Sequence, residues 1–291
     1  MVIPERILVA TDGSRDAVRA AEAASDLAKR SGSELHVVHV WHDVPGFAHK
    51  FVKAELRRQG QETLDEQVRR IEDSGVMVAE AHLRGGRTSH EVISLSRKIG
   101  AGLLIVGCRG LGTVQRILMG SQSEEIVHHA EIPVLVMRGG DGAWPPARIV
   151  IGEDFSDDAR QAGNLAVSIG SFYQSQAILL FAHPDLPEVP EGEARDAAAR
   201  NLMDMRQRDE DRLESRAGEL EEILGSRPET RVSDGHPAAV LLKVVQEGDD
   251  PTLVAVGSRG RAGMIRTRLG SVSTKVVTAS RGPVLVSPHV E

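Results

Sequence analysis

The chain is poor in cysteine, in aromatic residues and in positive charge. Its 291 residues include one cysteine, Cys108, only 3% are aromatic, and the formal net charge at pH 7 is −7. A single thiol excludes an intramolecular disulfide and any CxxC metal site, which is usual for a reducing compartment. The acidic balance supplies no basic surface for DNA or RNA, so we expect no nucleic-acid partner.

Long hydrophobic runs are also missing. The apolar segments are far shorter than the ~20 residues that a membrane-spanning helix requires. The N-terminal residues lead directly into a predicted strand and do not resemble a signal peptide. We therefore expect a cytoplasmic protein with no membrane partner.

Sequence motifs of common enzymes are absent too. There is no Gly-Lys dipeptide for a Walker loop, and no complete GxGxxG, GxSxG or HExxH motif. Among the eleven histidines, His36 and His39 would point to opposite faces of a strand, so they cannot share a metal. His128 and His129 are more typical of contacts with carbonyls at a helix end. We predict no metal site and no catalytic residue.

A glycine pattern occurs twice. Each copy has two glycines three residues apart, then nine residues and a Gly-Ser pair: Gly107, Gly110, Gly120 and Ser121, and again Gly257, Gly260, Gly270 and Ser271. Each copy follows a short apolar run that is typical of a strand buried on both faces, and precedes an amphipathic segment that serine could cap. Glycine permits positive φ and close backbone approach, and a helix N-terminus attracts phosphate. The pattern predicts two phosphate-binding loops.

The rest of the chain is duplicated in the same order. Residues 7–14 match 149–156, and 133–136 match 283–286. The repeat predicts domains at 1–140 and 148–291, joined by a linker at 141–147. In both halves, short apolar runs alternate with helical stretches, which predicts βαβ units and a parallel sheet. The expected strands are 6–11, 34–40, 76–83, 102–107 and 132–137, then 148–153, 177–182, 228–232, 252–257 and 283–287.

A charged segment separates two strands of the second half. Residues 188–224 are dense in Glu, Asp and Arg. We interpret this segment as a long solvated helix with charge pairs four residues apart, in preference to a dedicated partner surface.

The duplicated G-x2-G-x9-G-[ST] motif, with a strand and an aspartate upstream, resembles the universal stress proteins, in their tandem two-domain, ATP-binding form. The resemblance covers essentially the whole chain. It implies an α/β fold of two tandem doubly wound five-stranded, mainly parallel sheets of the Rossmann-like, adenine-nucleotide type. It also implies ATP, with Mg²⁺, at the carboxyl ends of the strands in each half.

The resemblance assigns two sets of site residues. The glycines and serines would surround the triphosphate, the aspartates would meet ribose hydroxyls or Mg²⁺, and the end of the second strand would contact the adenine edge. An aspartate that only favours a helix start remains the alternative. The first set is Ala10, Asp12, Val40, Gly107, Arg109, Gly110, Gly120, Ser121 and Gln122, and the second is Gly152, Asp154, Ala182, Gly257, Arg259, Gly260, Gly270, Ser271 and Val272.

The two copies are not identical. Phe155 replaces Gly13, and Gly152 replaces Ala10, so we expect two ATP sites of unequal affinity. Ser258 stands where the first copy has Cys108, which favours a small loop residue over a redox sensor.

The function expected from the resemblance is a nucleotide-dependent regulatory switch in stress adaptation. Two alternatives stay open: a slow ATPase or nucleotide hydrolase of the same fold, and an assembly module without nucleotide. Segments 133–136 and 283–286 would be edge strands, and the resemblance implies that they pair within the chain and that two chains form a homodimer. The sequence identifies no other protein partner.

Overall fold

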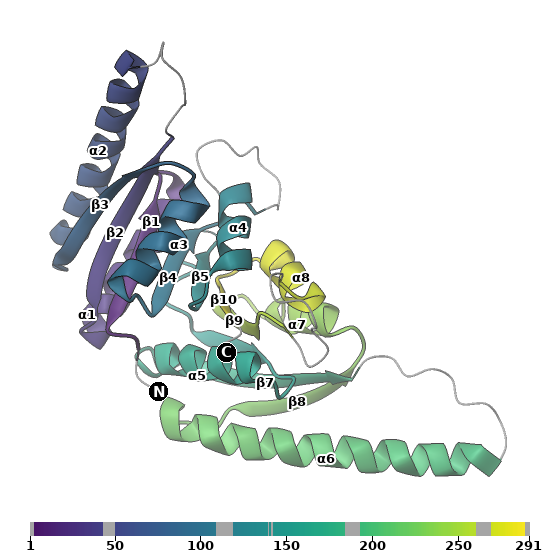
Figure 1. Ribbon diagram of the computed structural model, residues 1–291. Helices are drawn as coiled ribbons and strands as arrows, with labels where there is room; N and C mark the ends of the chain where they lie inside the picture. The colour runs from purple at the N-terminus through teal and green to yellow at the C-terminus, as the bar shows by residue number, and fades with distance from the viewer. Residues whose placement is uncertain are drawn as a thin grey trace.

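The structure is a computed structural model that describes residues 3–42, 50–108, 119–138, 140, 142–183, 193–259 and 269–288. Strands and helices alternate along both halves of the chain (Figure 1). The first half comprises β1 (Arg6–Thr11), α1 (Arg15–Ser31), β2 (Glu34–Trp41), α2 (Lys50–Asp73), β3 (Val78–Gly85), α3 (Thr88–Ile99), β4 (Leu103–Gly107), α4 (Ser121–His129) and β5 (Val134–Met137).

The second half repeats this order, and its α6 is the charged helix expected from the sequence. It comprises β6 (Arg148–Gly152), α5 (Asp157–Ser171), β7 (Gln176–His183), α6 (Glu193–Leu224), β8 (Glu229–Asp234), α7 (Pro237–Val245), β9 (Thr252–Gly257), α8 (Ser271–Ala279) and β10 (Val284–Ser287). The N-terminal part of α6 projects beyond the sheet (Figure 1). Most described side chains between 200 and 212 are exposed or half-buried.

All strands belong to one ten-stranded sheet with the order β3-β2-β1-β4-β5-β10-β9-β6-β7-β8. Strand pairs within each half are parallel. The halves meet where β5 and β10 pair in antiparallel orientation, with Leu135 opposite Leu285. The predicted pairing of these two edge strands within the chain is confirmed.

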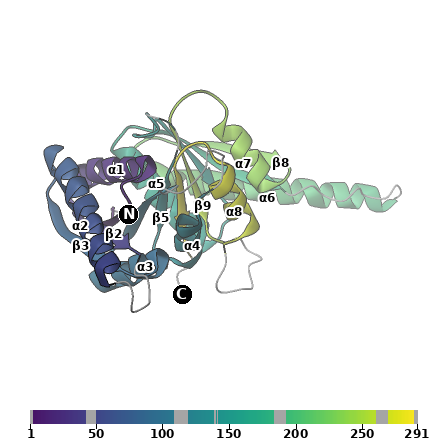
Figure 2. The same ribbon diagram turned by 90° about the horizontal axis from the view of Figure 1, so that it is seen from above.

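Helices cover both faces of the sheet, which confirms the doubly wound α/β fold (Figure 2). Residues of α1, α2, α5 and α6 contribute to the hydrophobic core on one face, and residues of α3, α4, α7 and α8 to the core on the other. The strands between them, such as Ile7–Val9 and Leu103–Val106, are almost fully buried. Both faces of the central strands are therefore apolar, as the sequence predicted.

Corresponding serines begin the first helix of each half. The Ser14 hydroxyl accepts a hydrogen bond of 3.3 Å from the Ala17 amide, and Ser156 accepts one of 3.2 Å from Ala159. A stripe of alanines on the inner side of α1 is buried, and Gly32 ends this helix with φ of 75°. A serine cap, an apolar stripe and a glycine stop are the usual sequence features of such a helix.

A polar cluster joins α1 to the second half. The Trp144 indole donates to Asp26 at 3.1 Å, and the Tyr173 hydroxyl donates to the same carboxylate oxygen at 2.6 Å. Partial burial opposes ionisation of Asp26, but hydrogen bonds from Tyr173, Trp144 and Arg30 hold its pKa below the usual value. The pairing of β5 with β10 is thus supported by a second contact between the halves.

In the ranges described above, no helix is both long enough and apolar enough to cross a bilayer.

Candidate functional site

A cavity of about 590 Å³ lies at the carboxyl edge of the strands in the first half. Its walls are the ends of β1, β2 and β4, one side of α2, and the first turns of α3 and α4. Its volume is in the range of small-molecule sites, ~300–1,000 Å³. Of the first predicted set, the cavity brings together Ala10, Asp12, Val40, Gly107, Gly120, Ser121 and Gln122. Arg109 and Gly110 lie outside the described residues.

The N-terminus of α4 opens onto this cavity. Gly120 is the N-cap residue and has no side chain with which to cap the first turn, whereas Ser121 is the first residue of the helix. The expectation that Ser121 is the cap is therefore wrong, and Gly270 and Ser271 repeat the arrangement at α8. Backbone amides and the positive end of the helix dipole without a side-chain cap form an anion-binding position.

The first glycine of each motif is required by backbone packing. A Cβ on Gly107 would lie 2.7 Å from the Ala17 nitrogen, and one on Gly257 would lie 2.7 Å from the Ala159 nitrogen. Neither of these glycines has positive φ, and Gly120 has φ of −66°. The predicted need for positive φ is wrong at these positions, because the ends of β4 and β9 must instead approach the first turns of α1 and α5.

Asp12 and Asp154 order the chain at the start of a helix. One carboxylate oxygen of Asp12 accepts from the Ser14 amide at 3.0 Å, and Asp154 accepts from Ser156 at the same distance. These bonds support the helix-start role that the sequence left open. Asp12 also lines the cavity, so this local role is compatible with contact to a ligand.

The α2 wall of the cavity and the His39 side chain beneath it were not predicted from the sequence. Gln59, Gly60 and Thr63 of α2 line the cavity beside His39 and Trp41 of β2. A Cβ on Gly60 would lie 3.1 Å from His39, so glycine allows the helix to pass closely over this ring. A glycine inside an otherwise helical stretch was the signal available in the sequence.

His39 is held in place by the backbone of β1. Its Nδ1 atom makes a 2.9 Å hydrogen bond with the Thr11 carbonyl oxygen. Burial lowers the pKa of His39, although the Thr11 carbonyl and the Asp12 charge oppose this shift. A neutral ring that donates from Nδ1 fits both observations.

At the corresponding strand edge of the second half, side chains of the neighbouring helices fill more of the space. A Cβ on Gly152 would lie 2.9 Å from Leu241, so a side chain of α7 already fills the space that the smaller residue leaves. Phe155 has φ of 63°, and the Arg212 guanidinium of α6 lies 3.8 Å from the centre of its ring. Gly13 and Thr63 are the counterparts in the first half, where the same space is not filled by a ring and a guanidinium.

The remaining residues of the second set lie at equivalent positions. Ala182 is in β7, Gly257 ends β9, and Gly270, Ser271 and Val272 begin α8. The Arg259 amide donates to Asp158 at 3.2 Å. Gly260 lies outside the described residues.

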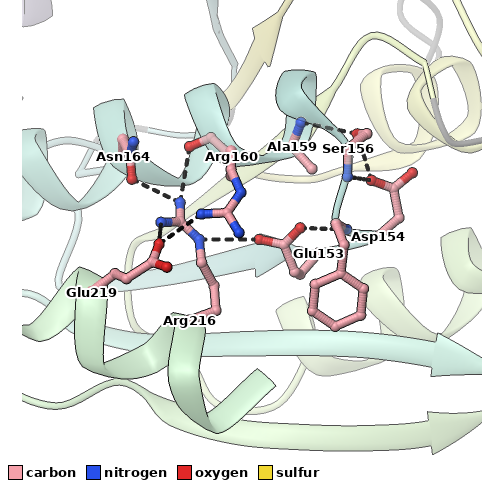
Figure 3. Close-up of polar contacts among 9 residues, drawn as sticks. Glu153, Asp154, Ser156, Ala159, Arg160, Asn164, Arg216 and Glu219 are labelled. Atoms are coloured by element: carbon pink, nitrogen blue, oxygen red, sulfur yellow. Dashed lines mark hydrogen bonds and ion pairs between the residues drawn. The ribbon is translucent and has the colours of Figure 1, made fainter. Parts of the chain in front are cut away.

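A buried ionic network ties α6 to the end of β6 (Figure 3). Glu153 accepts from the Phe155 amide at 2.6 Å and lies 3.4 Å from Nε of Arg216. Arg216 also donates to the Arg160 carbonyl and to the side chains of Asn164 and Glu219. Burial raises the pKa of Glu153, while the Phe155 amide and the Arg216 charge oppose the shift. The counterpart in the first half is a single neutral bond of 3.3 Å from Thr11 to Gln67.

Comparisons with known proteins agree with the duplicated fold. The model of the universal stress protein family matches residues 4–138 and again 146–288. A universal stress protein of Mycolicibacterium smegmatis is 27% identical over 96% of both chains, and one of Mycobacterium tuberculosis is 31% identical over 75% of this chain and 74% of its own. The crystal structure of a universal stress protein from Archaeoglobus fulgidus covers 98% of both chains with a TM-score of 0.67 at 22% identity. The chain belongs to the universal stress protein family, with two tandem copies of its domain.

Proposed function

We propose that the chain is an ATP-binding regulatory protein of stress adaptation whose tighter site is the first-half cavity. The observation that carries the proposal is the meeting of this cavity with the N-terminus of α4, whose N-cap residue is a glycine. A triphosphate needs backbone donors and a positive local field, and a helix N-terminus supplies both without a lysine.

The proposed pose follows from the walls of the cavity. The phosphates lie against Gly120 and the first turn of α4, and the adenine edge meets the backbone at Val40. Asp12 contacts a ribose hydroxyl or Mg²⁺, because a carboxylate beside a triphosphate is stabilising only through such a partner. The burial of His39 keeps its imidazole neutral beneath the ligand.

The second half offers an equivalent helix terminus but a more filled strand edge. Gly270 and Ser271 repeat the arrangement at α4. Leu241, Phe155 and Arg212 occupy space that smaller residues leave in the first half. We therefore propose that ATP binds the second half more weakly, because side chains must move before it enters.

Regulation requires that occupancy of one half be felt elsewhere. His128, in the last turn of α4, accepts a 3.2 Å hydrogen bond from the amide of Leu269, which precedes Gly270. A ligand at the N-terminus of α4 is therefore one helix away from the second glycine motif. We propose cytoplasmic action as a homodimer, in which ATP shifts the contact between the halves.

Isothermal titration of MgATP into nucleotide-free protein tests the proposal. Ser121→Asp and Ser271→Asp form a matched pair, because both serines are exposed first residues of a helix. Aspartate at this position stabilises the helix and repels phosphate. We expect Ser121→Asp to weaken the tighter site about tenfold or more, equivalent to ~1.4 kcal/mol, and Ser271→Asp to leave it unchanged.

Two results would count against the proposal. Unaltered tight binding of MgATP by Ser121→Asp would show that the phosphates do not bind at the N-terminus of α4. Absence of any adenine nucleotide binding by the folded wild-type chain would instead favour the nucleotide-free assembly module. Turnover of ATP by the wild type that both variants retain would point to a contaminating activity.

A further inference from the structure

A second cluster of polar side chains lies on β2 and β3, away from the nucleotide cavity. His36, Glu80 and His82 each place one ligand atom within 4.8 Å of the others. His36 and Glu80 are near the beginnings of their strands, whereas the cavity is lined by Val38 and the residues that follow it in β2. The cluster is therefore a separate feature of the first half.

We propose that His36, His82 and Glu80 bind a divalent transition-metal ion of the zinc class. Nδ1 of His36 lies 3.3 Å from Nε2 of His82. Two nitrogens bound to one tetrahedral zinc at ~2.0–2.1 Å are separated by about the same distance. Two imidazoles and one carboxylate form a ligand set that zinc uses, with water in the fourth position.

The burial of the two histidines suits ligation. Both are 7% exposed, and Nε2 of His36 is buried without a hydrogen-bond partner among the described residues. A neutral imidazole is the form that binds a metal.

Carboxylates flank the other ring nitrogens. Oε1 of Glu80 lies 3.4 Å from Nδ1 of His82, and Oε2 of Glu34 lies 3.8 Å from Nε2 of His36. Metal-bound histidines commonly donate their second N–H to a carboxylate, which fixes the tautomer. Glu34 is placed to act on His36 in this way, while the exposed Glu80 side chain can turn toward the ion.

An irregularity in strand pairing brings these residues to one face. Leu35 pairs with Val78, but His36 pairs with Glu80, so β3 has one extra residue at this point. Without the extra residue, Glu80 would stand opposite Val37, whose side chain belongs to the apolar core under α1 and α2. The bulge turns Glu80 and His82 to the face of His36, as bulges do where a side chain must be redirected.

No metal site was predicted from the sequence, because His36 and His39 are neighbouring histidines on opposite faces of one strand. His36 and His39 do have different surroundings: His36 contacts His82, and His39 contacts Gly60 of α2. The partner of His36 lies 46 residues further along the chain, so only strand pairing and the bulge bring the two together.

Competition with a chromophoric chelator measures Zn²⁺ binding to the full chain after treatment with EDTA. We expect the wild type to bind one Zn²⁺ ion per chain tightly. His82→Gln should weaken it at least about 100-fold, and Glu80→Gln and Glu34→Gln should each weaken it by about 10–100-fold. Saturating Zn²⁺ should raise the Tm of the wild type and leave that of His82→Gln unchanged.

His183→Gln is the matched control. His183 is another buried strand histidine whose Nε2 has no hydrogen-bond partner among the described residues, but it belongs to the second half. Its replacement should leave the tight binding of Zn²⁺ unchanged. Because Glu80 is exposed, Glu80→Gln tests the site even if His82→Gln does not fold. Absence of tight Zn²⁺ binding by the wild type, or wild-type affinity retained in Glu80→Gln and His82→Gln, would overturn the proposal.

Discussion

The helices α2 and α6 occupy equivalent positions but contact the sheet in different ways. In the first half, the buried Gln67 of α2 accepts one neutral hydrogen bond from Thr11. In the second, the buried Arg216 of α6 joins Glu153 and three further partners. The same backbone position thus carries a weak neutral contact in one half and an ionic network in the other.

Side-chain size follows the same division. Gly60 and Thr63 leave a cavity beside α2, while Phe155 and Arg212 fill the equivalent space beside α6. In addition, the second half has the smaller Gly152 and the larger Leu241 where the first half has Ala10 and Val92. A duplicated fold has therefore kept one half open at the strand edge and made the other half more densely packed there.

The largest expected effect comes from breaking the ionic network. Arg216→Met removes the partner of the buried Glu153 carboxylate and should lower the free energy of unfolding by about 3–5 kcal/mol. Gln67→Met in the first half removes only a neutral bond, so a loss of about 1 kcal/mol is expected. Urea unfolding followed by circular dichroism measures both. Similar losses in the two variants would show that the helices are anchored equally.

A second prediction concerns the exchange of Ala10 and Val92 for Gly152 and Leu241. Gly152→Ala should destabilise the chain by about 1–3 kcal/mol, because the new Cβ would lie 2.9 Å from Leu241. Adding Leu241→Val should recover most of this loss. A double-mutant cycle on thermal unfolding gives the coupling. Additive effects would mean that Leu241 does not occupy the space left by glycine.

The smallest expected effect is the pH dependence that His39 contributes in the first half. Burial lowers the pKa of His39 in the folded state, so the unfolded chain binds the proton more readily. Stability contributed at this position should therefore decrease as the pH falls below the ordinary histidine value of 6.5. His39→Phe, which copies Phe181 of the second half, should reduce the slope. Melting temperatures measured between about pH 5 and pH 8 test this, and an unchanged slope would assign the dependence to other groups.

The sequence predicted the fold in detail because its signals are local. Apolar runs located the strands, and the helical stretches between them predicted the alternation of strands and helices. The pairing of β5 with β10 came from the family resemblance, since an edge strand has no sequence signal for its partner. The repeat also identified the turns that contribute Asp12 and Gly120 to the cavity.

Contacts between distant segments could not be predicted in the same way. The α2 wall depends on which side of a long polar helix faces the sheet, and Gly60 was its only clear marker. The pairing of Glu153 with Arg216 joins residues 63 positions apart. Gly107 lines the cavity, but the approach of β4 to α1, which also requires glycine at this position, was not predicted. Each of these features is set by packing across elements, which periodicity does not encode.

A crystal structure of the chain grown with MgATP tests the central claim most directly. The account predicts adenine beside Val40 and phosphates at the first turn of α4, with equal or lower occupancy at α8. Nucleotide bound only in the second half, or bound away from both helix N-termini, would contradict it.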